Sequence, residues 1–203
     1  MKVDKLALKL AIILAIITSI LGIIIQLFPF ASFSGLINGE ISLLRYNLML
    51  DNENLIISPQ NTIGIRSIYS IISSVFLLLS TFYLFISYRK HKNTSKTITA
   101  NSIFLGAAFV NLFASTMTIQ SYSWLFKVLK IFLDSFQGSY LTSAGILQLY
   151  GFKMTIIDIA WLIYLNVLLA ILLIGLILYN VIKQEEDKEI EKKVIEIPIT
   201  VPT

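Results

Sequence analysis

Residues Ala11 to Phe28 read AIILAIITSILGIIIQLF and carry no charged side chain. This uncharged stretch continues to Gly39, and three more follow it, at 67–88, 97–126 and 159–182. A helix rises about 1.5 Å per residue, so about 20 residues cross the roughly 30 Å hydrocarbon core of a bilayer. The sequence therefore predicts an all-α integral membrane protein, a four-transmembrane-helix bundle with spans at about 7–29, 66–88, 98–126 and 156–182.

Composition supports one membrane domain. The chain has 203 residues, 56% of them hydrophobic, and a mean hydropathy of +0.81, whereas roughly 45 to 50% apolar residues is usual in soluble domains. We expect a membrane domain at 1–183, with outer loops at about 30–65 and 127–155, and a charged cytoplasmic tail at 184–203. The first apolar run is longer than the 7 to 15 residues typical of a signal peptide and ends at Pro29, so we expect it to be a retained span.

The basic residues predict the orientation. Eleven of the 16 Lys and Arg residues lie in the N-terminal segment, in the connector between spans two and three, or in the tail. Loops that carry more Lys and Arg tend to remain in the cytoplasm. We therefore expect a multi-pass protein of the cell membrane with both termini cytoplasmic. Because these charges flank the spans, they predict the lipid bilayer as a partner and do not favour nucleic acid.

Several kinds of chemistry have no residues to support them. The chain has no cysteine and a single histidine, His91, which lies in the basic connector. Thiol chemistry, paired haem ligands and carboxylate-bridged metal sites are therefore not expected. No Asp, Glu, Lys or His lies deep inside a span, and no nucleophile motif is present. We predict no catalytic residues, no metal site and no cofactor.

Uncharged polar residues form stripes on the spans. On the third span, small and polar residues repeat at steps of three and four, and the second span has a parallel stripe of serines. In lipid, small residues let helices approach closely, and polar side chains form hydrogen bonds across the contact. We predict a helix-packing seam, with a narrow water path as the alternative. The seam consists of Ser73, Ser80, Ala107, Asn111, Ala114, Thr118 and Asn166.

The outer loops predict two further elements. The apolar run at 40–50, the turn residues at 51–54 and a second apolar run at 55–57 indicate a small β-hairpin, with Arg45, Tyr46 and Asp51 as a possible partner surface. From Leu125 onward, the apolar spacing predicts an amphipathic helix that lies in the membrane interface. Asp158, at the start of span four, is expected to cap that helix.

This layout resembles the claudin-like tetraspan arrangement, with both termini inside, a larger strand-like first outer loop and a shorter second one. The claudin hallmark of a first-loop Trp followed by Gly-Leu-Trp and two Cys is missing, because this loop has neither Trp nor Cys. The resemblance thus covers topology and implies no function.

Three functions fit these residues. The leading interpretation is a non-enzymatic structural, assembly or accessory subunit of a membrane complex, with a membrane-protein partner or a second copy of itself. The alternative is a channel-like or transport-associated protein that uses the Ser and Asn stripes. A further alternative is a membrane immunity or protective protein.

Overall fold

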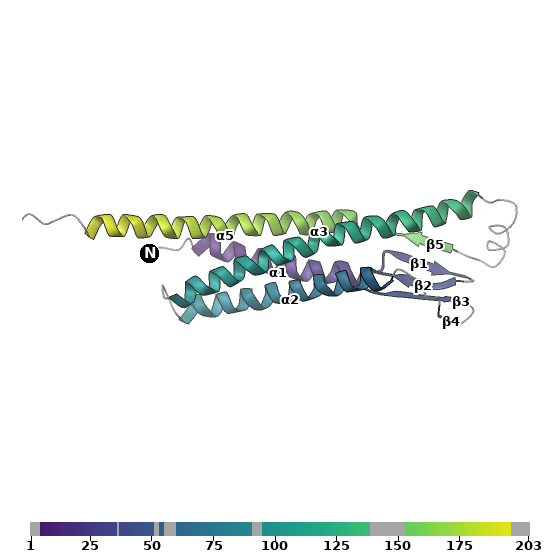
Figure 1. Cartoon of the computed structure of the whole chain (residues 1–203), viewed down its shortest axis with the longest axis horizontal. Coiled ribbons are helices and arrows are strands. Elements are labelled where there is room, and N and C mark those ends of the chain that lie inside the picture. The colour runs from purple at the N-terminus through teal and green to yellow at the C-terminus, as the bar shows by residue number, and fades with distance from the viewer. Residues whose placement is uncertain are drawn as a thin grey trace, which may run out of the picture.

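Four long helices and a small sheet make up the described part of the protein. The computed structural model describes residues 5–35, 37–50, 53–54, 60–90, 95–138 and 153–195. Its helices are α1 (Lys5–Leu27), α2 (Gln60–Lys90), α3 (Ser95–Gly138) and α5 (Ala160–Ile195). Its strands are β1 (Ala31–Ser34), β2 (Ile37–Ile41), β3 (Tyr46–Leu50), β4 (Glu53–Asn54) and β5 (Lys153–Ile156). Figure 1 shows the helices side by side, with the sheet at one end of the bundle.

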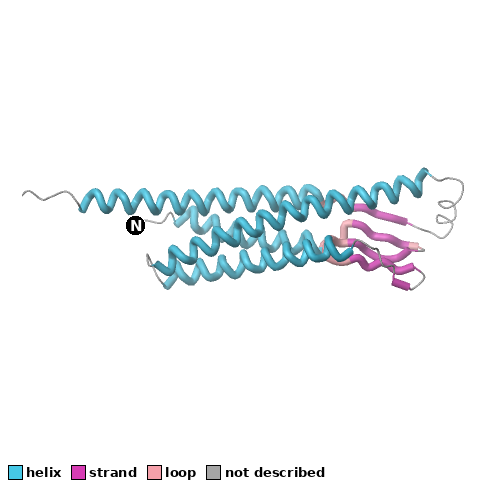
Figure 2. The backbone as a smooth tube through the Cα atoms, in the orientation of Figure 1, coloured by secondary structure: helices cyan, strands magenta, loops and turns pink. Residues whose placement is uncertain are grey.

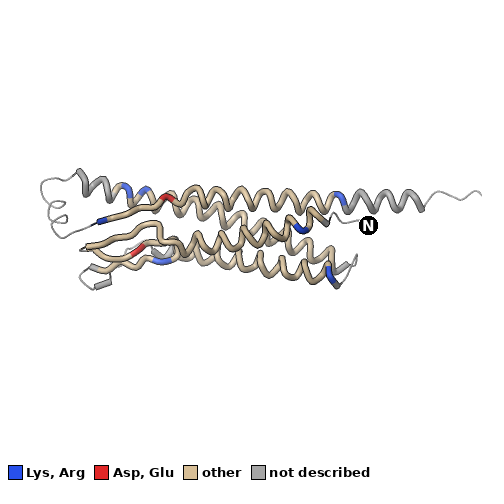
Figure 3. Tube along the Cα trace, turned by 180° about the vertical axis from the view of Figure 1, so that it is seen from behind, with Lys and Arg blue, Asp and Glu red and all other residues tan. Residues whose placement is uncertain are grey.

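All four helices are long and apolar enough to cross a membrane. The qualifying stretches are Leu6–Leu27, Ile63–Arg89, Thr97–Ile131 and Ala160–Lys183. The charged residues that the structure describes lie toward the two ends of the molecule, which leaves the middle uncharged (Figure 3). The prediction of four apolar helices in a bundle is confirmed. The fourth helix begins at Ala160 rather than at about 156, because 153–156 forms strand β5.

The helices pack as a ring. Each of α1 and α3 contacts both α2 and α5, while α1 and α3 barely touch each other.

The start of α5 is capped by Asp158. Its Oδ1 accepts a hydrogen bond from the Ala160 amide at 2.8 Å. A carboxylate that binds a free amide of the first turn is an N-cap. The expected capping role of Asp158 is thus confirmed.

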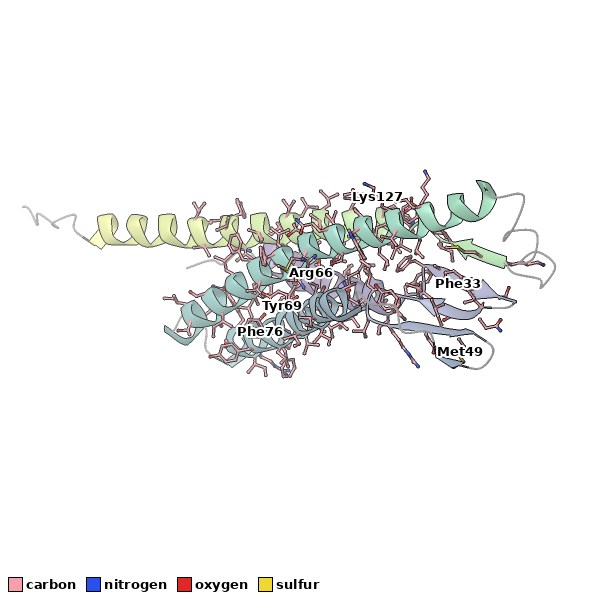
Figure 4. The ribbon with its side chains drawn as sticks, turned by 45° about the vertical axis from the view of Figure 1, so that its right-hand side comes forward. Phe33, Met49, Arg66, Tyr69, Phe76 and Lys127 are labelled. Atoms are coloured by element: carbon pink, nitrogen blue, oxygen red, sulfur yellow. The ribbon has the colours of Figure 1, made fainter. Side chains whose placement is uncertain are left out.

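The sheet is antiparallel, with the strand order β4-β3-β2-β1-β5. Figure 2 shows its strands at one end of the bundle. Side chains alternate between two faces, as a pleated strand requires. Phe33 is 7% exposed on the face toward the bundle, whereas Met49 is 39% exposed on the other face; both are labelled in Figure 4.

A turn at Ser42 to Arg45 docks the sheet on the bundle. The Ser42 amide donates to Arg45 O at 2.8 Å and the Arg45 amide to Ser42 Oγ at 2.9 Å, which closes the turn between β2 and β3. Leu43, inside the turn, is fully buried. Its carbonyl accepts from Ser67 Oγ of α2 at 2.7 Å, and the Leu44 amide donates to Gln26 O of α1 at 3.1 Å. The turn therefore joins the first two helices to the sheet.

This arrangement corrects the predicted hairpin. The run 40–50 is not one strand, because the Ser42 to Arg45 turn divides it between β2 and β3. The sheet also includes β1 and, from the second outer loop, β5, neither of which was expected. The turn residues at 51–52 and the second apolar run at 55–57 lie outside the described residues.

The second outer loop corrects another expectation. A separate interfacial helix was predicted from Leu125, but α3 runs without a break to Gly138. Leu125 and Leu129 are buried in one cluster with Phe30, Phe33 and other residues of the sheet. Leu125 and Leu129 of the apolar stripe therefore pack against protein, as part of a helix that continues from the third span.

Candidate functional site

A set of buried polar side chains lies between the helices. We call it the polar layer, and every member is at most 5% exposed. Side chains of all four helices contribute to it. Its members are Gln26, Ser70, Ser73, Ser74, Asn111, Ser115, Thr118 and Asn166.

Asn111 of α3 is the centre of the layer. Its Nδ2 donates to Ser74 Oγ at 3.1 Å and lies 3.5 Å from Ser73 Oγ, so it joins α3 to α2. Its backbone carbonyl accepts from Ser115 Oγ at 2.9 Å, and Ser115 Oγ in turn accepts from Asn166 Nδ2 of α5 at 3.0 Å. A chain of hydrogen bonds therefore runs across three helices.

Gln26 brings α1 into the layer. Its Nε2 donates to Ser70 Oγ of α2 and to Thr118 Oγ1 of α3, each at 3.1 Å. Thr118 Oγ1 also lies 3.4 Å from Ser70 Oγ and donates to Ala114 O at 3.0 Å. One glutamine thus connects three helices at the edge of the layer that is nearest the sheet.

Gly22 shows how closely α1 approaches this layer. A Cβ placed at Gly22 would lie 2.6 Å from Ser74 Oγ and 3.6 Å from Asn166 Nδ2. The first distance is shorter than Cβ contacts in proteins allow, so only glycine fits without movement of Ser74. Close approach of this kind is typical of helix contacts inside a membrane.

Two amide oxygens of the layer lack a protein partner. Asn111 Oδ1 and Asn166 Oδ1 are buried and accept no hydrogen bond from the described residues. Both amide nitrogens are engaged, so the two oxygens are what remains free for a donor. A buried acceptor without a partner usually costs about 1 to 3 kcal/mol. These oxygens are therefore the part of the layer best able to bind a small donor.

The structure places the predicted seam residues as follows. Ser73, Asn111, Thr118 and Asn166 belong to the polar layer. Ser80 is buried, but its hydroxyl donates to Leu77 O of its own helix at 2.8 Å. Ala107 and Ala114 are also buried, at 0% and 1% exposure, and contribute close contact rather than hydrogen bonds.

Two of the three residues of the possible partner surface, Arg45 and Tyr46, belong to the described part of the chain. Arg45 is exposed in the turn beside the bundle. Tyr46 is partly buried against the apolar cluster that contains Phe33 and Leu125. This burial raises the pKa of its hydroxyl to about 12. Asp51 lies outside the described residues. Arg45 and Tyr46 therefore lie at the end of the β2–β3 pair that contacts the bundle.

Sequence reasoning missed four members of the layer (Gln26, Ser70, Ser74 and Ser115) and its neighbour Gly22. Gln26 has the only primary amide in the uncharged stretch of the first helix, which is a signal that could have identified it. Ser115 lies one position from the predicted stripe on α3, and Ser70 and Ser74 flank the predicted serine stripe on α2. Gly22 has no side chain to signal its role, because its contact with α2 and α5 depends on how α1 packs.

The chemistry of the layer is that of neutral hydrogen bonding. It has no acid, base or thiol, and within the described ranges no three His, Cys, Asp or Glu side chains gather where they could hold a metal ion. Amides and hydroxyls can bind water or another neutral donor and can fix the register of helices.

Comparison of the chain with protein-family models, curated proteins and solved structures gave no match.

Proposed function

We propose that this protein is a non-enzymatic structural, assembly or accessory subunit of a complex in the cell membrane. One observation carries the proposal. The polar side chains inside the bundle are largely occupied with one another, while the sheet at its end presents a polar face that no described element covers. The polar layer then stabilises the scaffold, and the sheet face provides the contact surface.

The sheet face has the properties of a recognition surface. Thr155, Ser32, Glu40 and Asn47 lie in register on four neighbouring strands and are all exposed. The opposite face is anchored through Phe33 and Leu48. A polar row on a rigid strand scaffold can form several hydrogen bonds with a partner at little entropic cost. Glu40 gives this row one negative charge, which favours a partner that presents a Lys or Arg.

The decisive experiment is co-purification in a mild detergent. A Glu40→Lys, Asn47→Arg variant should lose its partner, because it reverses the charge of the row without touching the buried face. A Ser73→Ala, Ser80→Ala, Asn111→Ala variant serves as the matched control, and it should retain the partner. Retention by the first variant and loss by the second would contradict the proposal.

The runner-up function is a channel or transport role, which the free oxygens of Asn111 and Asn166 favour. These acceptors could replace part of the hydration of a small polar solute in the bilayer. Reconstituted liposomes distinguish the two functions. Solute or ion flux above that of empty vesicles, abolished by the same triple alanine variant, would reject the accessory role and establish transport.

The proposal places both termini in the cytoplasm and the sheet outside the cell. Because the chain has no cysteine, single-cysteine variants give a clear assay. Asn47→Cys should react with a membrane-impermeant thiol reagent in intact cells, whereas Asn93→Cys in the basic connector should react only after lysis. The opposite labelling pattern would invert the orientation.

A further inference from the structure

A crevice lies between α3 and the start of α5, separate from the polar layer. It has a volume of about 190 Å³. Ile119 and Phe126 of α3 and Ile163 of α5 make its apolar wall. Tyr122 and Asp158 provide polar atoms beside this wall. The crevice therefore combines an apolar surface with a single carboxylate.

Its position is that of the membrane boundary. It lies near the sheet end of two helices that are long enough to span the bilayer, at 119–126 on α3 and at 158–164, which covers Asp158 and the first turn of α5. Trp124 and Trp161, which lie within the same two segments, are 45% and 63% exposed. Exposed tryptophans at span ends usually lie at the level of lipid headgroups. An occupant of this crevice would therefore have both an apolar part and a polar part.

The carboxylate of Asp158 is held in place. Its Oδ1 accepts from the Tyr122 hydroxyl at 2.9 Å and from the Ala160 amide at 2.8 Å. The Tyr122 hydroxyl accepts in turn from the Ile159 amide at 3.2 Å. In the part of the chain that the structure describes, no Lys or Arg forms an ion pair with Asp158. A fixed, unpaired carboxylate at a partly apolar boundary favours a cationic donor.

The surroundings favour an ammonium group on a phospholipid. The rings of Phe126 and Tyr164 line the crevice, and aromatic rings attract ammonium cations. Lys127 is exposed and lies one helical turn beyond Ser123, which also lines the crevice; Figure 4 labels Lys127 on α3. Its cation is placed to bind a phosphate that is next to the ammonium group.

We propose that this crevice binds a membrane lipid whose headgroup carries a primary ammonium next to a phosphate, such as phosphatidylethanolamine. The ammonium binds Asp158 and the aromatic rings, and the acyl chain lies along Ile119 and Ile163. This inference is independent of the accessory role, because it concerns a different face of the molecule.

The test compares lipid adducts by native mass spectrometry of the detergent-purified full chain. Phosphatidylethanolamine should remain bound to the unmodified protein and phosphatidylglycerol should not. Asp158→Asn should reduce the first adduct about tenfold, since a hydrogen bond to a charged group is lost. The amide oxygen of Asn can still accept from Tyr122 and Ala160, so this variant should keep the cap and the fold. Arg66→Gln, which removes a charged side chain at the sheet end of α2 and away from the crevice lining, is the control and should bind like the unmodified protein.

A second variant and a soluble headgroup complete the test. Ser123→Trp should block the crevice from its exposed side without disturbing the buried core, and it should also lose the lipid. Soluble phosphoethanolamine should bind far more weakly than the lipid, because it lacks the acyl chain. The proposal is overturned if phosphatidylglycerol binds the unmodified protein equally well, if Asp158→Asn and Ser123→Trp both retain the phosphatidylethanolamine adduct, or if the soluble headgroup binds as tightly as the lipid.

Discussion

The protein has two hydrophobic cores that differ in the size of their side chains. The outer core joins the sheet to the ends of the helices. Of its 13 buried residues in the described part of the chain, only one is alanine, while Phe30, Phe33 and Tyr122 supply rings. The inner core lies in the half of the bundle away from the sheet, and five of its 11 buried residues are alanine. The polar layer separates the two.

The difference between the two cores follows from their surroundings, which are water beside the outer core and lipid around the inner core. Next to water, burial of large apolar side chains stabilises a fold by roughly 25 cal/mol per Å². Inside a bilayer that gain is missing, because lipid tails are as apolar as leucine, so helices associate through close packing of small residues and through hydrogen bonds. We therefore expect loss of volume to be harmful in the outer core and gain of volume to be harmful in the inner core.

The largest expected effect comes from Gly39→Ala in the sheet. Gly39 has φ +141°, and a Cβ there would clash with the backbone carbonyl oxygen of Asn47. The strained φ costs about 1 to 3 kcal/mol on its own, and strands β2 and β3 would also have to separate. We expect more than about 4 kcal/mol of destabilisation in total, a value in the exceptional range for one substitution. Thermal unfolding in detergent, with Gly64→Ala as the control, tests this, because nothing lies within 4 Å of a Cβ at Gly64.

Next in size is Phe30→Ala in the outer core. Phe30 is fully buried and its ring packs edge-on against Tyr122, with the ring centres 5.4 Å apart. Removal of a buried phenyl ring typically costs about 3 to 5 kcal/mol. Phe76→Ala on the lipid-facing side of α2, where Phe76 is 44% exposed, should cost far less. Equal losses for the two variants, measured by unfolding in a denaturing detergent, would mean that the outer core is not held by burial.

The matching test of the inner core is Ala107→Leu. Ala107 is 0% exposed, and the added volume would push α3 away from its neighbours. Overpacking of this kind costs about 1 to 3 kcal/mol. The adjacent Gly106 is exposed, and nothing lies within 4 Å of a Cβ there, so Gly106→Leu is a control of similar bulk on the same helix. If Ala107→Leu unfolds at the same denaturant concentration as Gly106→Leu, the small residues of the inner core are not needed for packing.

The smallest effect is expected in the polar layer. Asn111→Leu removes the bonds to Ser73 and Ser74 but keeps the volume, and hydrogen bonds between membrane helices contribute only about 0.6 kcal/mol on average. We expect a loss of about 1 kcal/mol. A double-mutant cycle with Ser74→Ala measures the coupling directly. A coupling above about 2 kcal/mol would make polarity, rather than packing, the main determinant of the bundle.

The sequence by itself determined the membrane part of this fold. Uncharged stretches of sufficient length must become helices in a bilayer, because every backbone group needs a partner inside the segment. The stripe from Ala107 to Thr118 could also be recognised as a buried face, because the helical repeat that places these side chains on one face is local. The N-cap at Asp158 is also local, because it needs only the next two residues.

Only the tertiary structure decided which segments meet beyond the helices. Strand β5 pairs with β1 from more than 100 residues away, as Ala31 lies opposite Ile156, and no local pattern specifies such a partner. The extension of α3 to Gly138 and the crevice at Asp158 depend on the same pairing, because the sheet covers the apolar stripe at Leu125 and Leu129. Gly22 and Gln26 complete the polar layer only when α1 packs between α2 and α5. Strand partners and helix neighbours are set by contacts between distant residues, and these contacts exist only in the folded chain.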